Sequence, residues 1–170
     1  MSGVIDHANL TLKFEGMLLS ALDLGTAVDQ VILDWSTNLS NGTGANQASQ
    51  QWRDTRTLSA SATENLDFAG GVTNAFGVAL TFTKFKIVLI KASAANVTNS
   101  VQVQRHATAG VPMLMAASDG IPLTRGAWMA LCWPDAAGIA VTATTGDSLT
   151  ITNSAGTTGV SYDIVIVGVD

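Results

Sequence analysis

Apolar and polar residues alternate with a period of two in several parts of the chain, and this alternation predicts β-strands. In the C-terminal part, Asp147–Asn153 and Val160–Gly168 alternate on either side of the small-residue loop Ser154–Gly159. Lys84–Lys91 alternates at its start and then becomes continuously apolar, as expected of a central strand covered on both faces. The full set of expected strands spans residues 10–20, 28–37, 50–59, 84–93, 98–105, 127–133, 139–144, 148–153 and 160–168.

Clusters of Gly, Asn, Asp and Ser separate these segments, and no helical period is sustained. Many short strands with such separators predict an all-β fold, an antiparallel β-sandwich. Nine strands in one domain suit a jelly roll. An immunoglobulin-like sandwich is the alternative, because the number of strands does not fix their connectivity. Residues 72–77 are expected to hold one helical turn, ended by Gly77 in a left-handed conformation.

The length of 170 residues predicts a single domain that spans residues 1–170. A chain of this size buries about 70 % of the surface that its unfolded form exposes. Within it we expect residues 1–10 to form an N-terminal arm. Residues 38–49 are rich in turn formers and carry no charge, which predicts an extended loop. In an assembly protein such a loop contacts a neighbouring subunit; the other interpretation is a loop without a role.

Charged residues make up only 12 % of the chain, about half the usual share, so its surface is polar but nearly neutral. A surface with few charges is weakly protected against association, which suits a component of an assembly. The eight basic residues are scattered and the net charge is −5, so we expect no nucleic-acid partner. The apolar stretch Met17–Leu22 is too short to span a membrane, and the N-terminus lacks the bases of a secretion signal. We therefore expect synthesis in a cytoplasm and no membrane partner.

Residues that carry chemistry are sparse, and we expect neither an enzyme nor a cofactor or metal site. The two histidines, His7 and His106, lie far apart in the sequence, and the single Cys132 is expected to be a buried small hydrophobe. Phosphate-loop and hydrolase-elbow motifs are absent from the sequence. Two alternatives stay open, a calcium ion held by loop carboxylates and a hydrolase that uses scattered aspartates.

The four tryptophans are the candidate interaction residues. Exposed indole faces would form a platform for sugar rings, whereas buried ones would belong to the core or to a subunit interface. All four lie in strand-like segments, which favours the second interpretation; they are Trp35, Trp52, Trp128 and Trp133.

From Leu58 to the C-terminus, about two thirds of the chain, the order of turn and strand motifs resembles a family of small virion structural proteins of tailed bacteriophages. The motifs are structural and assign no role to any single residue. They are Glu64–Gly71, Phe76-Gly77, Phe82–Ile90, Asn99–Val103, Ile121–Leu123, Trp133–Asp135, Val141–Asn153 and Tyr162–Gly168.

The resemblance implies a non-enzymatic protein of the phage particle, a capsid decoration or cement protein on the outer surface of the shell. Its implied partners are the major capsid protein and further copies of itself, with a homotrimer expected and the virion as its location. The first fifty-odd residues lie outside the resemblance, and an arm that reaches a neighbour is the role expected for them. The alternative is a tail or fibre module that binds host-surface glycan through exposed tryptophans.

Overall fold

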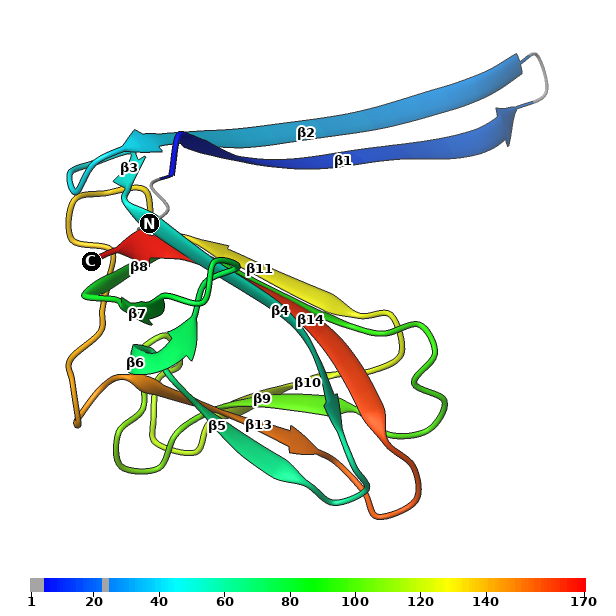
Figure 1. Cartoon of the computed structure of the whole chain (residues 1–170). Helices are drawn as coiled ribbons and strands as arrows, with labels where there is room; N and C mark the ends of the chain where they lie inside the picture. Colours follow the sequence, from blue (N-terminus) through cyan, green and yellow to red (C-terminus); the bar gives the residue numbers. More distant parts are fainter. Residues whose placement is uncertain (1–4, 23–24) are drawn as a thin grey trace.

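The computed structural model describes residues 5–22 and 25–170, and these residues form an all-β protein (Figure 1). Fourteen strands and no helix occur among them. None of these residues therefore belongs to a helix long and apolar enough to cross a membrane.

The body of the molecule is a sandwich of two antiparallel sheets, which confirms the predicted fold class (Figure 1). One sheet has the order β11-β8-β14-β4, with β12 beside β8, and the other has the order β10-β9-β13-β5. The first sheet comprises β4 (Gln50–Leu58), β8 (Lys84–Ala92), β11 (Trp128–Cys132), β12 (Ile139–Ala140) and β14 (Val160–Val169). The second comprises β5 (Thr63–Asp67), β9 (Val101–Arg105), β10 (Gly120–Leu123) and β13 (Ser148–Asn153), and a separate ribbon is made by β6 (Ala69–Thr73) and β7 (Ala79–Thr81).

The eight principal strands of the two sheets pair in a nested pattern. β4 pairs with β14, β5 with β13, β8 with β11, and β9 with β10, all antiparallel. The first strand of the body thus pairs with the last and the second with the second-last. The pairing continues in this way toward the middle of the sequence. A chain folded back on itself and wrapped into two sheets in this way has the strand order of a jelly roll. An immunoglobulin-like domain would instead place its first two strands side by side in one sheet.

Four aromatic rings fill the centre of the sandwich. Phe68, which follows β5, makes edge-to-face contacts with Trp52, Phe82 and Phe85 at ring-centroid distances of 5.6, 6.2 and 5.0 Å. Aromatic pairs prefer this geometry because the positive edge of one ring meets the negative face of the other. Trp52 is therefore a core residue, as one of the two interpretations of the tryptophans expected.

A long hairpin of β1 (His7–Leu22) and β2 (Gly25–Asn41) projects from the sandwich, and we call it the arm (Figure 1). Its strands pair antiparallel without a register shift, from His7 opposite Ser40 to Leu22 opposite Gly25. The short β3 (Gln47–Ala48) adds to β2 in parallel. The strands expected at 10–20 and 28–37 are thus confirmed, and each is longer than predicted.

The predicted boundaries of the arm and of the loop are both wrong. The arm comprises residues 7–41 and not residues 1–10, of which 1–4 lie outside the described residues. Residues 38–49 are not an extended loop, because their first part completes β2 and β3 lies near their end. Leu39 and Ala48 are almost completely buried, so apolar packing holds this segment against the body.

The helical turn expected at residues 72–77 is also wrong. β6 continues to Thr73, and a tight turn then leads into the chain that becomes β7. The Asn74 side-chain oxygen accepts hydrogen bonds from the amides of Phe76 and Val78, at 2.9 and 3.0 Å, which fixes a turn in place of a helix. The left-handed conformation expected of Gly77 is confirmed by its φ of 76°.

A polar network joins the two sheets near the start of β14. The Tyr162 hydroxyl donates a hydrogen bond to Glu64 on β5 at 2.8 Å, and Arg56 on β4 forms ion pairs with Glu64 and Asp54 at 2.6 and 2.8 Å. Burial, with the bond to Glu64 as the second cause, raises the pKa of Tyr162 well above its ordinary value. The phenol therefore stays protonated in the folded protein at pH values where it ionises in the unfolded chain.

We predict that the Tyr162→Phe variant loses stability near neutral pH but gains resistance to alkali. Removal of the bond to Glu64 costs about 1–2 kcal/mol at pH 7. Above pH about 10, the wild type loses about 1.4 kcal/mol for each pH unit, because its unfolded chain releases a proton that the folded protein keeps. The variant lacks this loss, so the two stability curves converge and cross. Denaturant unfolding of both proteins from pH 7 to 12 measures the difference.

Tyr162 is the one tyrosine of the chain, so tyrosinate absorbance reports its ionisation directly. We expect this absorbance to rise together with unfolding. Ionisation in the still folded protein near the ordinary pKa of tyrosine would contradict the prediction.

Candidate interaction surface

The base of the arm packs against the outer face of the five-stranded sheet and forms a small second core there. Leu39 of β2 and Ala48 of β3 contact Ile87 of β8 and Val167 of β14, and Ile5 completes the buried set. Ala8, Leu10, Leu89, Cys132 and Val165 pack around this set and are partly buried. Cys132 is thus half-buried on the outer face of its sheet, in apolar surroundings.

A buried lysine ties the segment after the arm to the body. Lys86 on β8 is fully buried, and its ammonium donates hydrogen bonds to the carbonyl oxygens of Gly44 and Asp135. The amide of Asn46 donates to the carbonyl of Pro134, which joins the same two loops. Burial, together with the nearby charge of Lys84, lowers the pKa of Lys86. The position of the arm is therefore fixed by polar bonds as well as by apolar contacts.

One face of the arm continues the apolar surface of this second core outward. Because paired residues of a hairpin share a face, the register places Leu12 beside Trp35, Phe14 beside Leu33 and Gly16 beside Val31. Leu10 and Leu12 are half-buried near the base, whereas Phe14 and Trp35 expose 56 % and 58 % of their surface. The apolar face is thus covered at the base of the arm and uncovered farther out.

The opposite face of the arm changes character along its length. Near the base it carries polar pairs such as Thr11 with Ser36 and Lys13 with Asp34. In the outer half it carries exposed Met17, Leu19, Val28 and Ile32. The outer half thus exposes large apolar side chains on both faces, with Glu15, Asp29 and Gln30 among them, and we call it the tip: residues 14–21 and 26–33.

Such a tip is unfavourable in water unless another surface covers it. A hairpin of two strands has no interior, and on its own it is marginally stable. Contiguous exposed apolar patches on soluble proteins mark sites that bind other molecules. Nine large hydrophobic side chains of the arm are exposed, from Phe14 to Trp35. The arm is therefore the candidate interaction surface of this protein.

Between the arm and the five-stranded sheet lies an apolar groove of about 490 Å³, which we call the wedge. Its upper wall is formed by Leu10 and Leu12 of the arm. Its lower wall is the outer face of the sheet, with Leu89 on β8, Ala130 and Trp128 on β11, and Val165 on β14. Figure 1 shows the arm and the sheet diverging from the base of the arm outward.

The structure divides the four predicted interaction tryptophans into two groups. Trp52 is buried in the core, and Trp133 is partly buried and packs against it. Trp35 lies on the apolar face of the arm and Trp128 lies on the lower wall of the wedge, both more than half exposed. Two of the four candidates are thus placed on the interaction surface and two are not.

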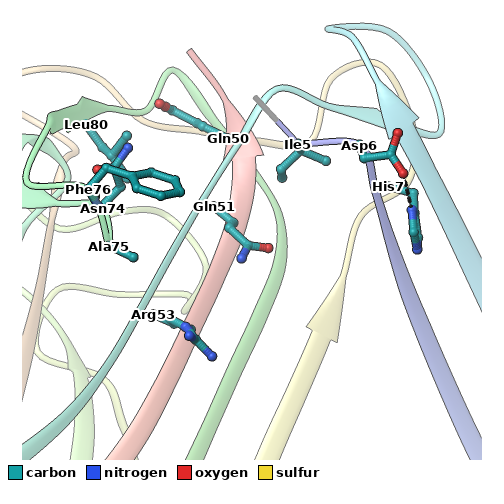
Figure 2. A pocket seen from close by; sticks show the side chains of 10 residues that line it. All are labelled: Ile5, Asp6, His7, Gln50, Gln51, Arg53, Asn74, Ala75, Phe76 and Leu80. Atoms are coloured by element: carbon teal, nitrogen blue, oxygen red, sulfur yellow. Dashed lines mark hydrogen bonds and ion pairs between the residues drawn. The ribbon is translucent and has the colours of Figure 1, made fainter. Parts of the chain in front are cut away.

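A second, more polar hollow of about 240 Å³ lies beside the base of the arm (Figure 2). Gln50, Gln51 and Arg53 of β4 line it together with Phe76 of the β6–β7 turn. Figure 2 shows Asp6 and His7 at its far side, joined by a contact of 2.8 Å between the carboxylate and Nδ1. Both of these side chains are exposed to solvent, so their attraction is weak.

Two aspartates and His106 make local structural contacts. Asp119 accepts a hydrogen bond from the amide of Ala116, and Asp147 accepts bonds from the Thr144 amide and the Ser148 hydroxyl. His106 accepts a bond from the amide of Ala109 in a turn. In residues 5–22 and 25–170, no group of three His, Cys, Asp or Glu side chains is placed to hold a metal ion.

Comparison with protein-family models, with curated proteins and with solved structures found no match to this chain.

We predict that Lys86→Met destabilises the protein by about 1–3 kcal/mol, because the carbonyls of Gly44 and Asp135 lose a buried donor. Lys84→Met is the matched control, since Lys84 lies on the same strand and donates to the carbonyl of Ala136 from an exposed position. We expect the control to cost less than about 1 kcal/mol. Denaturant unfolding measures both values, and hydrogen exchange at residues 42–46 reports the release of the loop. Equal costs for the two variants would contradict the role given to Lys86.

Proposed function

We propose that this chain is a non-enzymatic structural protein of a tailed-phage particle, a capsid decoration protein that binds the outer surface of the shell as an oligomer. The projecting arm with its exposed apolar tip carries the proposal. An exposed apolar surface of this kind functions when another protein covers it. In this chain it lies on a hairpin that extends beyond the sandwich. The resemblance of residues 58–170 to phage virion proteins supports a phage particle as the assembly in which the arm binds.

A decoration protein works by mass action. If its binding site exists only on the expanded shell, its binding energy stabilises the expanded state over the others. An oligomer multiplies weak contacts, because the second and third attachments are intramolecular once the first has formed. A closed cyclic oligomer matches the local symmetry of a shell, and three copies match its three-fold positions. The nearly neutral body, with 12 % charged residues, suits a surface that is covered in the particle.

A second candidate function is favoured by the two exposed tryptophans. Trp35 and Trp128 present indole faces to solvent, and such faces stack on sugar rings. This candidate makes the protein a tail or fibre module that binds glycan on the host surface.

We predict that the purified protein co-sediments with expanded shells assembled from the major capsid protein of the same phage, and does not co-sediment with unexpanded shells. Bound protein raises the temperature at which the expanded shells come apart. Differential scanning calorimetry of shells with and without the protein measures that shift. Absence of binding to expanded shells, with antibody labelling of the virion confined to the tail, would overturn the proposal.

The same preparation distinguishes the glycan candidate. Tryptophan fluorescence is recorded while host surface polysaccharide is added, and Trp35→Ala and Trp128→Ala serve as the variants. A shift in the wild type that both variants reduce would favour the glycan function. Unchanged fluorescence would count against it.

A further inference from the structure

We infer that the arm tip of one copy of this chain is seated in the wedge of a second copy. The inference deepens the proposed function, on which its biological setting rests. The contact itself involves only copies of this chain and can be tested without a shell.

The tip and the wedge match in their apolar surfaces. The tip exposes large apolar side chains on both faces, so a second copy that covers it must offer an apolar wall on each side. The wedge offers two such walls, Leu10 and Leu12 of the arm above, and Leu89, Ala130 and Val165 of the sheet below. The inner half of the arm, with its polar pairs on one face, would leave those polar groups without partners in such a slot. The outer half of the arm carries fewer polar side chains on that face, so it is the half that fits such a slot.

The tip of an arm does not fill the wedge of its own chain. β1 and β2 stay in register over the whole hairpin, with no bulge at which the ribbon could fold back. The arm leads away from the body, and its tip lies far from its own base (Figure 1). The tip that enters a wedge therefore comes from another molecule.

The area available is sufficient for a stable contact. Eight exposed large side chains of the tip offer roughly 600 Å² of apolar surface, if about half of each side chain is exposed. Contact covers a similar area on the partner, which gives a total of about 1,200 Å², at the lower end of the range of specific protein interfaces. Trp128 at the rim of the wedge supplies a large aromatic side chain of the kind that dominates interface energies.

The contact is heterologous, because the tip and the wedge are different surfaces of the same chain. Such contacts build either a closed ring or an open fibre, according to the rotation between neighbours. A ring leaves no tip uncovered, so we infer a closed ring. Three copies would give the three-fold oligomer of the proposed function.

Sedimentation velocity at several protein concentrations tests the contact with three variants. The tip variant is Phe14→Ser with Leu18→Ser, and the wedge variant is Trp128→Glu. The control is Asn9→Ala with Asn38→Ala, a pair on the polar face of the same arm and outside the lining of the wedge. We expect an oligomer of defined size for the wild type and the control, and at least tenfold weaker association for the tip and wedge variants. Thermal unfolding of the body should change little, since all of these side chains except Trp128 lie on the arm, and Trp128 is exposed.

Cross-linking shows whether the tip and the wedge meet. In a Cys132→Ala background, which removes the single cysteine, Leu18→Cys is placed in one preparation and Ala130→Cys in a second, tagged one. A short bis-maleimide should link the two chains when the preparations are mixed, and the yield should fall when the tip carries Phe14→Ser. A wild type that is monomeric, or an oligomer that neither the tip nor the wedge variant weakens, would overturn the inference.

The outcomes separate the two proposals. A monomer that still binds expanded shells overturns the arm contact and leaves the proposed function in place. An oligomer that depends on tip and wedge but does not bind shells supports the arm contact and overturns the proposed function.

Discussion

Every apolar face of a β-sheet must be covered, and this constraint organises the molecule. In the sandwich, each sheet covers the inner face of the other, and the rings of Trp52, Phe68, Phe82 and Phe85 fill the space between them. At the base of the arm, the outer face of the five-stranded sheet is covered by β1–β3. Farther out, the arm has nothing opposite it within the chain. A ribbon of two strands has no third layer with which to cover itself, so its apolar side chains are available to another molecule.

The apolar face of the arm can serve as a binding element because its base is firmly attached. Apolar packing alone would allow the base to slide over a flat sheet, since the hydrophobic effect is not directional. The ammonium of Lys86 removes this freedom, because its bonds to two loop carbonyls have a fixed direction and are buried. No buried side-chain nitrogen or oxygen atom of the described residues lacks a hydrogen-bond partner. The base of the arm is thus attached to the body by apolar packing and by buried hydrogen bonds whose donors and acceptors are all paired.

Local sequence patterns predict many of the strands. They do not show which faces of those strands are covered by other parts of the protein. Alternation located β8, β13 and β14 well, because their side chains face a core on at least one side. It missed β5, β6, β7 and β10, which are short and rich in Gly, Pro or polar residues. Trp35 and Trp52 lie in similar strand-like segments, yet one is exposed and the other is buried. That difference depends on which sheet lies opposite, and a period of two carries no information about it. The hairpin register, which places exposed apolar side chains on both faces of the tip, is likewise set by a pairing across the turn that sequence analysis did not consider.

Charges on the arm explain how such a surface stays soluble before it is covered. Lys13 and Glu15 lie 3.6 Å apart on the polar face, and Asp34 is paired with Lys13 across the hairpin. Asp29 interrupts the apolar face beside Leu18, where an aliphatic residue would have extended the patch. Charged residues on long unprotected strands oppose the edge-to-edge pairing that leads to aggregation. An exposed charge loses its hydration only when a partner covers it closely. The charges therefore disfavour random association that buries them, and they disfavour less a contact that leaves them at its rim. The arm thus combines an apolar surface that favours binding with a few charges that restrict how a partner can cover it. This combination favours a partner with a groove that fits the arm over a partner with a flat apolar surface.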